Sequence, residues 1–199
     1  MPYTPCAAQL AANITVDCAN PIVGGYTGEG VIIPLSSVTP TIVKDAENPR
    51  MITTLSVGEG DKVVVVDNVF AEPFTGSGTA GNADSGRPMY VKTIAIRIPL
   101  RGAEVSKNIV EPMFNSPEGF IGIFPKKDKN NDGAFEVVGL LQAMKGDINT
   151  LTRDENANGG DWSLSLVATE PFAEVTLVGE DKTYASAKAM YDALVAKAY

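Results

Sequence analysis

Short apolar runs separated by turn-forming residues make up most of the chain. The clearest run is MYVKTIAIRIPL (89–100), which alternates with the period of two that a β-strand requires. One face of this strand would carry Tyr90, Lys92, Ile94, Ile96 and Ile98, and the other would carry Val91, Thr93, Ala95 and Arg97. Because the first face is mainly apolar and the second is mixed, the pattern predicts a half-buried strand.

A second alternating run, WSLSLVA (162–168), places Trp162, Leu164, Leu166 and Ala168 on one face. Further short strands are predicted at VIIPL (31–35), TIVK (41–44), MITTLSV (51–57), GFIGIFP (119–125), AFEVVGLL (134–141) and AEVTLVG (173–179). The run KVVVVDNVF (62–70) has four consecutive valines, which predict a strand buried on both faces.

The segment EPFTGSGTAGNADSGRP (72–88) is nearly devoid of large apolar residues. It cannot build a core, and a loop of this length inside a compact domain is either functional or disordered. We predict a projecting loop that becomes ordered against a neighbouring subunit. The alternative, which the sequence does not exclude, is a flexible surface loop.

Two segments have helical character. Residues 103–115 (AEVSKNIVEPMFN) predict a short helix that Pro112 limits. The C-terminal segment 183–198 carries apolar residues at helical spacing, and Thr183 or Asp181 can cap its start. Those apolar residues are Tyr184, Ala187, Tyr191, Leu194, Val195 and Ala198.

The predicted fold is therefore mainly β, with a β-sandwich or barrel core, one internal helix and a C-terminal helix. We expect a single domain over residues 1–199 with an N-terminal extension at residues 1–30. The hydrophobic fraction of 44% and the charged fraction of 20% are ordinary for a folded protein. No stretch approaches the roughly 20 apolar residues of a membrane span, and we see no secretory signal.

The formal net charge is −8, and 12 of the 24 acidic residues lie in residues 128–199 with only 6 of the 16 basic ones. An acidic protein does not hold nucleic acid by neutralising its phosphates. An acidic wall can still line a passage for DNA, because repulsion prevents sticking. Solubility is the simpler interpretation, and composition alone favours it.

Catalytic and metal-binding signals are sparse. The chain has no histidine, which removes the commonest general base and the commonest metal ligand. The two cysteines, Cys6 and Cys18, have no Cys-x-x-Cys partner; they could form a disulfide, although two buried thiols are favoured. No nucleophile elbow or phosphate-binding loop is present, and the G-x-G-x-x-G spacing at 76–81 precedes no helix pattern. We predict no enzyme, no catalytic residue and no cofactor.

The stretch DKNNDGAFEVVG (128–139) begins like an EF-hand calcium loop. The residues that match that loop are Asp128, Asn130, Asp132, Gly133 and Glu136. The final bidentate acid is missing, because its position holds Gly139, and both flanks are predicted strands instead of helices. The residue types also suit a hairpin turn, which we favour over a metal site. A second cluster at 154–161 also lacks the final acid, because Ser165 holds that position, and a second hairpin turn is favoured there.

Three aromatic residues, Tyr26, Tyr90 and Trp162, would be able to form a sugar-binding platform. Burial in a β core is favoured instead.

The stretch 119–171 resembles a bacteriophage tail tube protein, of the type found in phages of Bacteroidetes hosts. It carries a strand, a turn, the strand AFEVVGL (134–140), a threonine-rich segment at 148–160 and the alternating strand WSLSLVATEP (162–171). The opening segment VDCANPIVGGY (16–26) is similar as well. The likeness covers roughly a third to a half of the chain; neither the 72–88 loop nor the C-terminal helix belongs to it.

This resemblance implies a structural protein of the virion whose β core forms hexameric rings. The rings would stack around a lumen that conducts DNA without binding it specifically, and other virion proteins would be partners. The protein would be made in the cytoplasm of the bacterial host and reside in the phage tail. Other virion roles (tail terminator, head completion, capsid decoration) and a surface β-sandwich that binds glycan, with or without calcium, stay open as alternatives.

Overall fold

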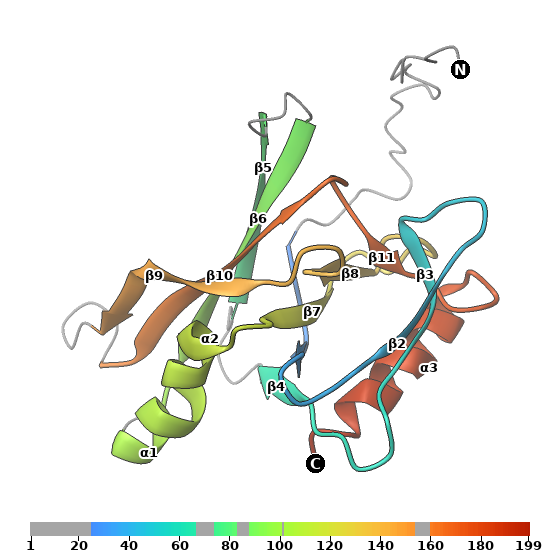
Figure 1. Ribbon diagram of the computed structural model, residues 1–199. Coiled ribbons are helices and arrows are strands. Elements are labelled where there is room, and N and C mark those ends of the chain that lie inside the picture. Colours follow the sequence, from blue (N-terminus) through green and yellow to red (C-terminus); the bar gives the residue numbers. More distant parts are fainter. Residues whose placement is uncertain (1–24, 67–73, 83–87, 101, 154–159) are drawn as a thin grey trace.

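Two β-sheets and a C-terminal helix form three layers in the computed structural model, which describes residues 25–66, 74–82, 88–100, 102–153 and 160–199 (Figure 1). The larger sheet has the strand order β2 (Thr41–Lys44), β3 (Met51–Ser56), β11 (Thr176–Leu177), β8 (Phe135–Val138), β7 (Phe120–Pro125), β1 (Gly30–Pro34) and β4 (Val64–Val66). The smaller sheet has the order β5 (Phe74–Asn82), β6 (Pro88–Ile98), β10 (Trp162–Glu170) and β9 (Lys145–Arg153). The prediction of a mainly β fold with a sandwich-like core is confirmed.

The middle strands of the larger sheet are buried on both faces. In β1, Val31 and Ile33 pack in a core next to the C-terminal helix, whereas Ile32 packs in a second core that faces the smaller sheet. The same division holds in β7, where Ile123 faces the helix side and Phe124 faces the smaller sheet. Successive side chains of a strand point to opposite faces, so these continuous apolar runs fit the central layer of three.

The predicted faces of the two best strands are confirmed. In β6, Lys92, Ile94, Ile96 and Ile98 are all buried, and in β10 the residues Leu164, Leu166 and Ala168 are buried as well. The two strands pair antiparallel from Tyr90 opposite Glu170 to Ile98 opposite Trp162. This pairing forms the centre of the smaller sheet.

Both predicted helices are present. The internal one runs as α1 (Ala103–Val105), a π-helical turn η1 (Ser106–Val110) and α2 (Glu111–Asn115). The π-helical turn ends at Val110, two residues before Pro112, which has no backbone N–H to donate. The C-terminal helix α3 (Tyr184–Val195) is shorter than predicted, and Thr183 caps it by accepting a hydrogen bond from the Ser186 N–H at 3.2 Å.

The prediction that residues 62–70 form a strand buried on both faces is wrong. Of the described residues 62–66, only Val64–Val66 form a strand, β4, and it lies at the edge of the larger sheet with β1 as its neighbour. Val64 is 44% exposed. Valine suits an edge strand as well as a central one, so the run alone does not place it. Residues 67–70 lie outside the described ranges.

The predicted loop at 72–88 is also wrong for most of its length. Phe74–Asn82 form β5, which pairs antiparallel with β6 at every position from Phe74 opposite Ile96 to Asn82 opposite Pro88. The end of this hairpin rises above the body of the molecule (Figure 1). The segment therefore projects, but as a strand that β6 orders through backbone pairing. Residues 72–73 and the tip at 83–87 lie outside the described ranges.

For the segment before WSLSLVA (162–168), the sequence predicted a hairpin turn at 154–161 but gave no bounds for a strand. The threonine-rich segment forms β9, the edge of the smaller sheet, and its pairing with β10 shifts between Ser163 and Ser165. At the N-terminal end, the expected extension at 1–30 is described only from residue 25, and there Tyr26 already bridges to Lys126 of the body. Cys6 and Cys18 lie outside the described ranges. In those ranges, no helix is both long and apolar enough to cross a membrane.

Candidate functional site

The stretch that begins like a calcium loop forms the turn of a β-hairpin. The strands β7 and β8 flank it and pair antiparallel, so the helix–loop–helix frame of an EF-hand is missing and the hairpin prediction is confirmed. The Asn130 side chain serves the turn itself: its amide nitrogen donates to Asp128 Oδ2 at 3.0 Å, and its oxygen accepts from the Gly133 N–H at 2.5 Å. Asp128, Asn130 and Asp132 border a shallow surface depression that Arg50 also lines.

The most unusual chemistry lies between the two sheets. Ionisable side chains meet there, buried at the centre and exposed at one end, in what we name the inter-sheet cluster. It consists of Tyr26, Lys92, Lys126, Glu136, Glu170 and Glu174. Lys92 comes from β6, Glu136 from β8 and Glu170 from the end of β10, so three strands of both sheets supply its centre. The side chains of Lys92 and Glu170 are 4% and 0% exposed. Charged side chains are almost never this buried unless they are paired.

Glu136 is the hub of the cluster. Its Oε1 lies 2.8 Å from Lys92 Nζ, and its Oε2 accepts a hydrogen bond from the Tyr26 hydroxyl at 2.9 Å. Lys126 Nζ lies 3.5 Å from the same Oε2 and forms a second ion pair with Glu174 at the solvent side. Burial alone would raise the pKa of Glu136, but the charge and hydrogen bonds of Lys92, Lys126 and Tyr26 outweigh it and lower that pKa.

Glu170 has a different environment. Its Oε1 accepts a hydrogen bond from the Leu141 N–H at 3.2 Å, and its Oε2 has no hydrogen-bond partner among the described residues. Lys92 Nζ is 4.0 Å from that Oε2. Burial raises the pKa of Glu170 in spite of the backbone donors at Leu141, Leu140 and Gly139. The environment therefore shifts the pKa values of the two carboxyl groups in opposite directions, down for Glu136 and up for Glu170.

A cleft of about 260 Å³ leads to the cluster beside β5. Tyr26, Lys92, Lys126 and Glu136 line it together with the backbone of Gly76. The Tyr26 ring is held in place by Phe74 and Phe124, with ring centroids at 5.6 and 5.7 Å, and by its hydrogen bond to Glu136. Burial, with the nearby Glu136 charge, raises the pKa of the Tyr26 hydroxyl far above its ordinary value, so it stays a hydrogen-bond donor.

Gly76 gives Tyr26 the room it needs. A Cβ at Gly76 would lie 2.3 Å from a Tyr26 ring carbon, whereas a Cβ at Gly78, two residues along the same strand, would meet nothing within 4 Å. Because the Tyr26 ring cannot move without losing its contacts, Gly76→Ala is expected to lower the free energy of unfolding by about 1–3 kcal/mol. Gly78→Ala is the matched control, expected to stay within about 0.5 kcal/mol of the wild type in urea unfolding. Equal effects of the two substitutions would contradict this account of the cleft.

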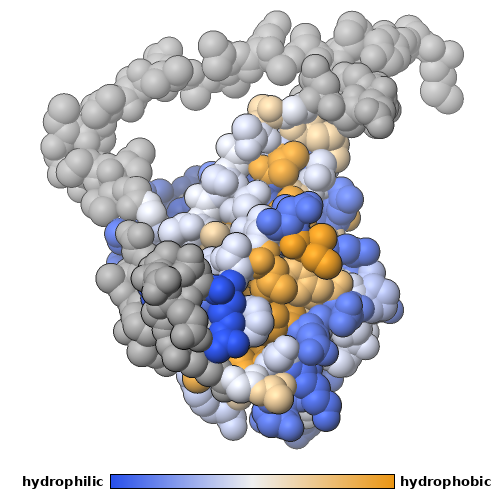
Figure 2. Space-filling model, turned by 90° about the vertical axis from the view of Figure 1, so that its left-hand side faces the viewer, coloured by the Kyte–Doolittle hydropathy of each residue, from blue (hydrophilic) through white to orange (hydrophobic). Residues whose placement is uncertain are grey.

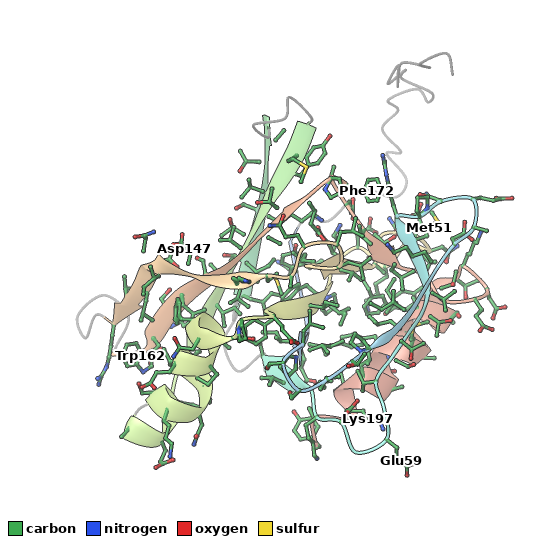
Figure 3. The ribbon with its side chains drawn as sticks, viewed as in Figure 1. Met51, Glu59, Asp147, Trp162, Phe172 and Lys197 are labelled. Atoms are coloured by element: carbon green, nitrogen blue, oxygen red, sulfur yellow. The ribbon has the colours of Figure 1, made fainter. Side chains whose placement is uncertain are left out.

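The three aromatic residues considered for a sugar platform do not share a surface. Tyr90 and Trp162 lie at opposite ends of the β6–β10 pairing, and Tyr26 lies in the cleft between the sheets. Figure 3 shows Trp162 at the end of the smaller sheet, where β10 begins, and the Arg153 guanidinium lies 5.4 Å from its ring centroid. The preference for burial is borne out only in part: all three residues are half-buried, and Tyr26 and Trp162 pack against the core between the sheets.

Sequence reasoning missed the inter-sheet cluster, although one signal was present. Lys92 falls on the apolar face of its strand by simple alternation, which marks a lysine that must be buried and paired. Its partners Glu136 and Glu170 follow 44 and 78 residues later, so no local pattern links them. Within the described ranges, no group of three or more histidine, cysteine, aspartate or glutamate residues is arranged to hold a metal ion.

Open sheet edges form the other candidate functional feature. The smaller sheet ends at β5 on one side and β9 on the other. Residues 75–81 of β5 are exposed, and the strand carries no charged residue and no proline. Figure 2 views the side that carries β9 and shows apolar surface gathered between polar regions. Ile148 of β9 is 74% exposed.

Comparisons with protein-family models, with curated proteins and with solved structures gave no match. The chemistry of this chain therefore has to be inferred from its own residues and fold.

Proposed function

We propose that the chain is a structural subunit of a virion, with the phage tail tube as its most specific role. In this proposal it forms rings by joining its sheets to those of neighbouring copies, and the rings stack around a lumen for DNA. It has no catalytic activity and requires no cofactor. The observation that carries the proposal is the long, uncharged edge strand β5 at the side of an open sheet.

An edge strand of this kind is unusual in a protein that stays monomeric. A free edge presents unpaired N–H and C=O groups, and natural proteins protect such edges with charges, proline, bulges or short strands. The strand β5 has nine residues in regular pairing with β6 and none of these devices. A partner strand from another copy would complete its backbone hydrogen bonds.

The smaller sheet offers two different edges for such a contact. Its strands alternate in direction from β5 to β9, so β9 of one copy would run antiparallel to β5 of the next copy. A contact between two different surfaces is heterologous, and it closes into a ring when the rotation between copies allows it. Ring closure would remove all the free edges of this sheet. The resemblance to tail tube proteins implies six copies in the ring.

The charge of the chain is compatible with this role. The net charge of −8 is concentrated in residues 128–199, where 12 acidic residues oppose 6 basic ones. A DNA-conducting lumen must not hold the phosphate backbone, and acidic walls satisfy this requirement through repulsion. We therefore expect no measurable affinity for duplex DNA at physiological salt.

Sedimentation velocity over a concentration series tests the proposal. We expect a discrete large species that grows as the concentration rises, because heterologous contacts assemble by mass action. A strictly monomeric boundary at every concentration would contradict it. Discrete rings that never stack would favour a tail terminator over the tube. A monomer that calcium or a glycan stabilises against heat would favour the surface-module alternative.

A further inference from the structure

The inter-sheet cluster contains a reactive arrangement that a structural role does not require. The Lys92 side-chain nitrogen and the carboxyl groups of Glu136 and Glu170 meet where little water reaches them. One Glu170 oxygen has no hydrogen-bond partner among the described residues. On the shared face of the smaller sheet, Ala168 pairs with Lys92 and Glu170 lies two residues further along β10. Glu136 reaches the same point from β8 of the larger sheet.

We propose that Lys92 and Glu136 condense spontaneously into an intrachain amide bond, with Glu170 carrying the protons between them. The bond would join the Lys92 side-chain nitrogen to the Glu136 side-chain carbonyl carbon. It would tie β6 of the smaller sheet to β8 of the larger sheet by a covalent cross-link. This inference stands independently of the proposed virion role.

The nucleophile is in position. Lys92 Nζ lies 2.8 Å from Glu136 Oε1, so the carboxyl carbon is one bond beyond a close contact with the amine. Both side chains are largely removed from water, at 4% and 13% exposed. Holding the two groups together replaces an encounter between separate molecules.

The electrophile is activated on its opposite oxygen. The Tyr26 hydroxyl donates to Glu136 Oε2 at 2.9 Å, and the Lys126 ammonium lies 3.5 Å from the same atom. Negative charge develops on that oxygen when an amine attacks the carboxyl carbon. Preorganised donors at such a position stabilise the transition state. After the reaction, Oε2 would remain as the amide oxygen and keep the Tyr26 hydrogen bond.

Glu170 is placed to move the protons. Its Oε2 is 4.0 Å from Lys92 Nζ and has no hydrogen-bond partner among the described residues, while the Leu141 N–H fixes its other oxygen. Glu170 takes one proton from the Lys92 ammonium, and the freed amine attacks the Glu136 carboxyl carbon. The first proton and a second one from the nitrogen then pass through Glu170 to Oε1 of Glu136, which leaves as water. An ammonium and a carboxylate thus give an amide and water, with no oxidant or other reactant.

The test is the mass of the purified full-length chain under denaturing conditions. We expect it to be one water, about 18 Da, below the mass of the sequence. Tryptic digestion should yield a single linked species that joins residues 63–97 to residues 130–145, because trypsin cannot cleave at a modified Lys92. Lys92→Arg and Glu170→Gln should restore the full mass. Glu174→Gln, at the exposed end of the cluster, should keep the loss.

A wild-type chain with the full mass of its sequence would overturn the proposal, whatever the variants do. The chain contains Asp132–Gly133, a dipeptide that can lose water by closing a succinimide ring. The same mass loss found within 130–145 without a link to 63–97 would therefore also overturn it. A link from Lys92 to Glu170 in place of Glu136 would overturn the assignment of roles.

Discussion

The double variant Ser77→Lys and Thr79→Lys is expected to stay folded and to lose all ring or tube assembly. Both residues are exposed on the edge strand β5, so the substitutions leave the core intact. Lysine side chains are among the devices by which natural proteins prevent edge-to-edge pairing. Two ammonium groups on this edge would have to be desolvated if a neighbouring strand paired with it. Sedimentation velocity and circular dichroism on the same sample measure assembly and folding separately.

The matched control places the same two charges elsewhere. Ala189→Lys and Ala193→Lys add them at exposed positions of the C-terminal helix α3, which packs against the larger sheet. This control is expected to assemble like the wild type. If the β5 variant also assembled normally, the edge would not be the contact, and the proposed ring geometry would be wrong.

Phe124→Ala is expected to lower the free energy of unfolding by about 3–5 kcal/mol, a large share of the stability of one domain. Phe124 is fully buried and packs against Phe74, with ring centroids 5.0 Å apart, and against Tyr26. These rings lie where the two sheets meet at the cleft, so truncation leaves a cavity that neither sheet can close. Urea unfolding of dilute protein, below the concentration of assembly, measures the effect.

Phe172→Ala provides the comparison. Phe172 lies half-buried just after β10, with the Arg50 guanidinium 5.0 Å from its ring centroid (Figure 3). Its truncation removes the contact with Arg50 and one partly buried contact with the core on the helix side, so the loss is expected to be about 1 kcal/mol. Similar losses for the two phenylalanines would mean that the aromatic group at the cleft does not hold the sheets together.

The sequence predicted best where alternation is strong. The strands β6 and β10 were predicted with the correct faces because one side of each carries isoleucine, leucine or alanine at every second position. The hairpin at 128–133 followed from its turn residues, and α3 from its helical spacing. In each case the local pattern and the tertiary fold favour the same structure.

The failures have a common physical cause, which is that partners distant in sequence decide the outcome. The glycine-rich β5 has no apolar alternation and becomes a strand because β6 supplies its hydrogen bonds. The valines of β4 lie at an edge because only β1 pairs with them. Lys92 was assigned to the correct face. Its ion pairs with Glu136 and Glu170 were not predicted, because only the packing of the two sheets brings these residues together.

Negative-stain electron microscopy of the purified protein over a concentration series tests the central claim most directly. The account predicts rings of uniform diameter with an open lumen, which stack into tubes as the concentration rises. Dispersed single particles at every concentration would contradict the claim that this chain is a self-assembling tube subunit.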